Sequence, residues 1–219
     1  MLSLCRCRIV LLALALTAWS ASAFPEPPKS RSQALAALAS AQTTDRLEAI
    51  VWLANYGRMT DAPLLDERLR DESGLVRDYA EQALWALWSR SGDAALDALM
   101  ARGVAEMQAQ AYAAAIATFG EVVKRRPDFA EGWNKRATVY YLAGDYDKSI
   151  ADCAEVLKRN PRHFGALSGL GQIYTALERY EEALAWYRKA LEVNPNMLGV
   201  EFNIKTIETI LKEKHAKSI

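Results

Sequence analysis

The chain has 219 residues, and its 27 basic side chains balance its 27 acidic ones. A net charge of zero argues against nucleic acid or an anionic membrane surface as the main partner, because both select a basic stripe. Hydrophobic residues make up 51% of the chain, so it has enough apolar surface to build a core without disulfides.

The N-terminus has the order of a secretory signal peptide. Arg6 and Arg8 precede an apolar run over residues 9–19, and small residues lead up to Ala23. A membrane-spanning helix needs about 20 apolar residues, and this run is nearer half that length. We therefore predict export, cleavage of residues 1–23 and no integral membrane anchor. A proline-rich linker over residues 24–32 follows.

Cleavage would also decide which cysteines the mature protein keeps. Cys5 and Cys7 would leave with the signal peptide, and Cys153 would be the only thiol of the mature protein. An internal disulfide would then be impossible, so the hydrophobic core must carry the stability. The mature sequence contains no Asn-x-Ser/Thr sequon, which fits a bacterial source. We predict the bacterial periplasm as its location.

Residues 33–92 repeat weakly at a period of 31. Leu38, Arg46, Ala49 and Leu53 recur as Leu69, Arg77, Ala80 and Leu84. The stretch 69–84 reads as the end of one helix, a short polar turn and a second, amphipathic helix. It resembles a HEAT-type helical repeat, which would make this region two stacked helix pairs. The alternative is an irregular helical cap for the repeats that follow.

The second half of the chain repeats at a period of 34. Prolines at 127, 161 and 195 share this spacing, and so do Leu99/Trp133/Leu167, Gly103/Ala137/Gly171, Tyr112/Tyr146/Tyr180, Ala115/Ser149/Ala183 and Phe119/Cys153/Tyr187. Proline lacks an N–H and ends each second helix. In the middle unit we predict helices over 132–143 and 146–160. The small residues allow two helix backbones to approach closely, while the large ones fill the space beside them.

These columns resemble the tetratricopeptide repeat family, whose pattern is W-x2-L-G-x2-Y, then A-x3-F, then P within 34 residues. We assign residues 93–195 to three units, whose 34-residue register runs 96–129, 130–163 and 164–197. Residues 164–197 follow the pattern with Leu for Trp and Tyr for Phe, and the first unit departs from it at Glu106. Residues 196–219 contain a capping helix over 197–214 and a tail. The resemblance implies an all-α, right-handed helical-repeat solenoid, with HEAT-like helices preceding three helix pairs.

The sequence offers no constellation for catalysis. His163 and His215 stand apart from one another and from any cluster of metal ligands, so we interpret both as surface histidines. There is no Gly-rich phosphate loop after a strand, and no nucleophile in a recognisable motif. We predict neither a cofactor nor enzymatic activity.

Cys153 and the tryptophans have structural interpretations. Cys153 occupies the packing column of Phe119 and Tyr187, so we predict a small buried hydrophobe with an inert thiol. Trp52, Trp85, Trp88, Trp133 and Trp186 could stack on a carbohydrate, but helical spacing beside leucines favours core positions.

In the implied fold, the first helices of successive units line a concave groove, and function resides on that face. The repeat register turns eleven residues toward it: Met100, Val104, Met107, Asn134, Lys135, Thr138, Tyr141, Ser168, Gly169, Gln172 and Thr175. We predict that these residues bind a protein or peptide and that the chain is a scaffold or adaptor. The oligomeric state is not predicted.

Some tetratricopeptide co-chaperones grip an acidic C-terminus with a Lys/Asn/Lys/Arg clamp. The matching positions here hold Met100, Val104, Lys135, Gly165 and Gly169. Only Lys135 could pair with an anion, so we predict that the groove does not bind an acidic tail in this way. Two other functions stay open: a glycan- or peptidoglycan-associated binding protein, which would expose its tryptophans, and an enzyme of unknown type, which would need converging polar groups in a closed pocket.

Overall fold

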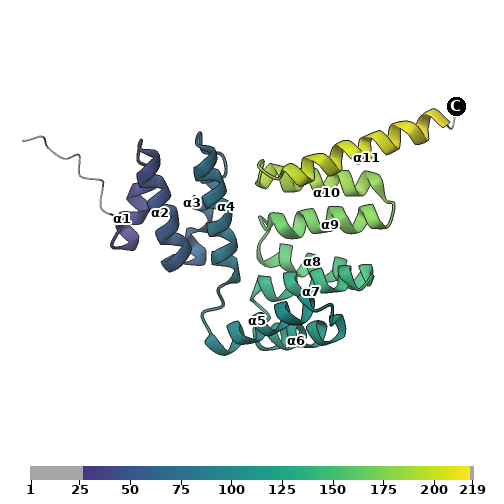
Figure 1. Cartoon of the computed structure of the whole chain (residues 1–219), viewed down its shortest axis with the longest axis horizontal. Helices are drawn as coiled ribbons and strands as arrows, with labels where there is room; N and C mark the ends of the chain where they lie inside the picture. The colour runs from purple at the N-terminus through teal and green to yellow at the C-terminus, as the bar shows by residue number, and fades with distance from the viewer. Residues whose placement is uncertain (1–26, 218–219) are drawn as a thin grey trace, which may run out of the picture.

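A computed structural model describes residues 27–217, and within them the chain is helical throughout, without strands. The predicted signal peptide and the first residues of the predicted linker lie outside this range. The N-terminal block comprises α1 (Arg31–Ala37), α2 (Thr43–Tyr56), the 3-10 helix η1 (Met59–Asp61), α3 (Ala62–Arg68) and α4 (Gly74–Ser89). Figure 1 shows this block on one side of the molecule and the remaining helices on the other.

The repeat array follows. Unit 1 is α5 (Ala94–Gln108) and α6 (Tyr112–Arg125), unit 2 is α7 (Ala130–Leu142) and α8 (Tyr146–Arg159), and unit 3 is α9 (Phe164–Ala176) and α10 (Tyr180–Val193). The last helix, α11 (Leu198–Lys217), packs on α10. The three predicted helix pairs and the capping helix are confirmed. The bounds predicted for the helices of unit 2 and for the capping helix differ from the observed ones by at most three residues at either end. Helices fray at their ends, so such differences carry no weight.

The turn inside each unit uses the same unusual backbone conformation. Gln110, Gly144 and Glu178 have φ angles of 58°, 78° and 56°, and they stand 34 residues apart. This left-handed region suits glycine, while other residues pay about 1 kcal/mol or more to enter it. The turn geometry is therefore imposed by the packing of the two helices, because two units adopt it without glycine.

Small residues of the first helices face large residues of the second helices. A Cβ on Gly103 would lie 2.7 Å from the Phe119 ring, and one on Gly171 would lie 2.5 Å from the Tyr187 ring. In unit 2 the pair is Ala137 and Cys153, both buried. The predicted close approach of the two helices is thus confirmed. In unit 2, where alanine replaces the glycine of the other units, the partner is a cysteine, which is smaller than phenylalanine or tyrosine.

The N-terminal block contains two helix pairs that repeat one arginine bond. Arg46 donates to the carbonyl oxygens of Ser40 and Ala41 at 2.9 and 3.1 Å. Thirty-one residues later, Arg77 donates to the carbonyl oxygens of Asp71 and Glu72 at 2.9 and 3.2 Å. Each guanidinium thus satisfies orphan carbonyls in the turn that precedes its own helix. The weak 31-residue period corresponds to real structural equivalence, and the HEAT-type resemblance stays a prediction.

The block packs against the turns that enter and leave unit 3. Arg162 donates to Asp66 at 2.6 Å, Arg77 to Asn196 at 2.9 Å, and Asn194 to Glu81 at 2.9 Å. Phe164, Leu167, Ala190 and Val193 join the hydrophobic cluster of α1–α4. In Figure 1, α4 runs past the near ends of α9, α10 and α11. The block therefore covers one side of unit 3.

Candidate functional site

A small hollow lies between the first helices of units 2 and 3. It encloses about 60 Å³ and is lined by Asn134, Ala137, Thr138, Tyr141, Ser149, Cys153, Gly165, Gly169, Gln172 and Ile173. Five of the predicted groove residues meet here: Asn134, Thr138, Tyr141, Gly169 and Gln172. None of the lining residues carries a charge, so the hollow suits an uncharged group.

Gly169 leaves the hollow open. A Cβ built on it meets no atom within 4 Å, although Gly169 sits in the middle of α9. Glycine costs about 1 kcal/mol in a helix relative to alanine. The observed space means that packing does not require this glycine.

Three of the predicted residues serve the core of unit 1. Met100 is 7% exposed, and it packs with Leu96 and Phe119, with Val104 and Met107 against the same cluster. These residues do not line the hollow. Their binding role stays a prediction for the outer part of the groove.

The hydroxyl groups of the groove bond to their own helices. Thr138 donates to the carbonyl of Asn134 at 2.9 Å, Thr175 to that of Gly171 at 2.8 Å, and Ser168 to that of Gly165 at 3.1 Å. Such bonds to a preceding helical turn leave the hydroxyl oxygen free to accept from a ligand. Ser168 is itself buried, and the hydroxyl of Thr175 also bonds to that of Tyr187, so Thr138 is the best placed of the three.

Lys135, the one cation among the predicted residues, is already paired. Its ammonium lies 3.1 Å from a carboxylate oxygen of Glu131, whose side chain is buried. Asn134 donates to the other oxygen of Glu131 at 3.0 Å. Burial alone would raise the pKa of Glu131, but the hydrogen bond from His163 and the hydrogen bond and charge of Lys135 lower it below its ordinary value.

His163 is fully buried, so its interpretation as a surface histidine is wrong. Its Nδ1 accepts from the backbone N–H of Ala166 at 3.1 Å and thereby caps α9. Its other nitrogen, 3.1 Å from Glu131, therefore carries the proton and donates it. Trp88 stacks on the ring with centroids 4.4 Å apart. The sequence could not reveal this, because the covering tryptophan comes from the N-terminal block. His215 is exposed, as predicted.

Sequence reasoning missed two features of the groove. The first is Trp85 of α4, whose ring occupies the space where a Cβ of Gly165 would be. The second is on α11, where Phe202 stands 34 residues after Ser168 and is 69% exposed, with Leu198 76% exposed one turn before it. The 34-residue spacing could have placed Phe202 in the groove column. Nothing in the sequence links Trp85 to Gly165.

Cys153 is buried, as predicted, and desolvation raises the pKa of its thiol to about 12. A thiol in that state is a poor nucleophile. Trp88 is a core residue, and the other predicted core tryptophans are partly buried. Two guanidinium groups lie over the ring of Trp133, those of Arg136 at 5.0 Å and Arg159 at 4.7 Å from its centroid. These cations cover faces that a sugar would need.

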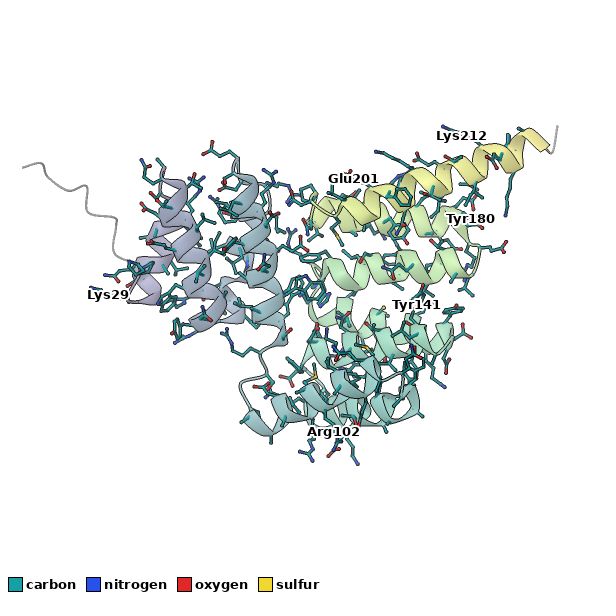
Figure 2. All side chains as sticks on the ribbon, viewed as in Figure 1. Lys29, Arg102, Tyr141, Tyr180, Glu201 and Lys212 are labelled. Carbon is teal, nitrogen blue, oxygen red and sulfur yellow. The ribbon has the colours of Figure 1, made fainter. Side chains whose placement is uncertain are left out.

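Figure 2 shows the side chains on the ribbon, with Tyr141 on the part of the array remote from α1–α4.

Across residues 27–217, His, Cys, Asp and Glu side chains form no group of three that could hold a metal ion. Within the same range, none of the helices has the length and apolarity to cross a membrane.

The fold and the hollow define an all-helical repeat solenoid with an uncharged hollow between the first helices of units 2 and 3. In a comparison with known protein families, residues 100–157 and 134–197 match the model of the tetratricopeptide repeat. Residues 100–197 are thus similar to tetratricopeptide repeats, as the sequence resemblance implied.

One curated relative is a tetratricopeptide repeat-containing protein of Rhizobium etli, 35% identical over 61 residues. The match covers 28% of this chain and 30% of that protein, so the chain spans less than a third of the relative's length.

Two solved structures share the fold. The first tetratricopeptide domain of Spaghetti (RPAP3), bound to the HSP90 peptide SRMEEVD, has a TM-score of 0.51 at 23% identity, covering 53% of this chain and 93% of that one. The Sgt2 tetratricopeptide domain from Aspergillus fumigatus has a TM-score of 0.54 at 22% identity, covering 57% and 83%.

Proposed function

We propose that this protein is an exported scaffold that binds an uncharged, extended segment of a partner protein in the concave groove of units 2 and 3. The observation that carries the proposal is the open, uncharged hollow around Gly169. Extended segments can enter such a hollow with one side chain while their backbone bonds to hydroxyl and amide groups at its rim. Thr138 and Gln172 are exposed and offer such groups.

A protein with this fold binds a peptide in a related structure, that of Spaghetti with SRMEEVD. That peptide carries three acidic residues, and the groove of this chain is unsuited to them. Lys135 is held by Glu131, and Gly165 and Gly169 supply no cation. An unpaired anion in the hollow would cost more than it gains, so the proposed partner segment is apolar or neutral.

Filling the groove should remove binding without unfolding the protein. Gly169→Arg places a bulky charge in the hollow, and the melting temperature should hold or rise, because arginine favours helix by nearly 1 kcal/mol over glycine. A neutral partner would meet an unpaired charge, so its affinity should fall by about ten-fold or more. Ala154→Arg, on the exposed side of α8, is the matched control. The measurement is a pull-down of native partners beside thermal melts, and full retention of every partner by Gly169→Arg would place the binding surface elsewhere.

Export to the bacterial periplasm is part of the same proposal and rests on the order of residues 1–23. The HEAT-like nature of residues 33–92 and the absence of catalysis also belong to it. Intact mass of the exported protein tests the first point, with Phe24 expected as the first residue. A retained Met1 would contradict export and return the protein to the cytoplasm.

A further inference from the structure

The N-terminal block reaches into the edge of the groove through one side chain. Trp85 of α4 lies against Gly165 of α9, and any Cβ at position 165 would overlap the end of its indole ring. Gly165 also lines the hollow between units 2 and 3. Since glycine has no side chain, none separates the indole from the hollow at this position.

The indole is held rigidly in this place. Its ring meets those of Trp88, Phe164 and His163 edge to face, with centroids 5.3, 5.3 and 5.4 Å apart. Edge-to-face contacts of this kind fix ring orientation beyond simple burial. The hydrogen bonds of Arg77 and Glu81 to Asn196 and Asn194 anchor the same helix along the array. Trp85 is nevertheless only partly buried, so part of the ring remains accessible.

We propose that Trp85 is a specificity-determining residue of the groove, and that the two halves of the chain form one binding site. This rests on the proposed function. The indole fills the space over Gly165, beside the hollow of about 60 Å³ that Gly165 lines. The partner residue that enters there must therefore be small and uncharged, such as alanine, serine or valine. Without the indole, the hollow would extend past Gly165 and admit leucine or an aromatic ring.

The experiment selects binders from a phage-displayed library of random dodecapeptides, using the mature full-length protein. Wild type should select small residues at one position of the consensus. Trp85→Leu should shift the preference at that position toward large apolar residues by about ten-fold, the scale at which pockets discriminate by one or two methylenes. The double variant Trp85→Leu with Gly165→Val refills the space from the other side and should restore the preference for small residues.

Trp88→Leu is the matched control. Trp88 belongs to the same aromatic cluster but is not among the nearest neighbours of the Cβ position of Gly165. Its loss loosens the seam without opening the hollow, so the consensus should stay that of wild type. An equal shift with Trp88→Leu, or an unchanged consensus with Trp85→Leu, overturns the role of Trp85 while leaving groove binding intact. If wild type selects no peptide that Gly169→Arg rejects, the proposed function itself fails, and the inference fails with it.

Discussion

The two halves of the molecule stabilise their helix pairs by different means. In the N-terminal block, Arg46 and Arg77 each donate to two backbone carbonyls in the turn before their own helix. In the repeat array, Gly103 and Gly171 let the rings of Phe119 and Tyr187 fit against the opposite helix. One half depends on directed polar bonds at its turns, and the other on steric fit along its helices.

This difference explains why the two periods are unequally visible in the sequence. Steric fit constrains both partners, so small and large residues recur together in every unit of the array. An arginine that donates to carbonyl oxygens constrains only itself, because every residue offers a carbonyl. The 31-residue repeat therefore leaves a fainter trace than the 34-residue one, although both correspond to equivalent structure.

Removing the arginine of the first pair should have the largest effect. Arg46→Ala deprives the carbonyls of Ser40 and Ala41 of their donor and leaves Asp71 without its 2.8 Å partner. Unpaired buried groups are costly, and we expect the thermal midpoint to fall by about 10 °C. Arg102→Ala, at an exposed arginine of α5, should change it by less than about 2 °C. Equal midpoints for both variants would contradict the role assigned to Arg46.

Overpacking the array should have the next largest effect. In Gly171→Leu the new side chain would meet the Tyr187 ring, and relief of the clash should cost about 1 to 3 kcal/mol. Neighbouring units share interfaces, so the loss should spread along the array. Gly169→Leu, two residues away in the same helix but in open space, should be neutral or stabilising. Circular dichroism melts of the two variants compare them, and an unchanged midpoint for Gly171→Leu would mean that the steric fit is not what holds the unit.

The seam between the halves offers the smallest of the three effects. The pKa of Glu131 is lowered, so its ionised form stabilises the fold above the ordinary carboxyl range, and this contribution is lost as pH falls through the folded-state pKa. Glu131→Gln cannot ionise and should lower the midpoint by about 3 °C at neutral pH. The gap between wild type and variant should close in strong acid. Melts from pH 7 down to pH 3 measure it, and a gap that is constant over this range would show that ionisation of Glu131 does not stabilise the seam.

Much of the fold could be predicted from the sequence. Pro127, Pro161 and Pro195 located the ends of the second helices, and the small residue at 171 located the closest helix contact, because both effects act between residues that are near in the chain or locked in the repeat register. The groove was predicted in part. Thr138, Gly169 and Gln172 line the hollow, whereas Met100 packs into the core of unit 1, since the first unit lacks a preceding helix pair against which to order its groove face.

By itself, the sequence determined the helical periods, the turns and the lack of a cationic clamp in the groove, because each depends on the residue types at fixed positions of the repeats. Only the tertiary structure decided how the halves meet. Because α4 lies against α9, His163 is buried under Trp88, where it caps α9 and donates a hydrogen bond. For the same reason, the ring of Trp85 packs against Gly165. Residues 85 and 165 are far apart in the chain and belong to repeats of different length. No periodicity connects them, so their contact follows from the folding of one solenoid against the side of another.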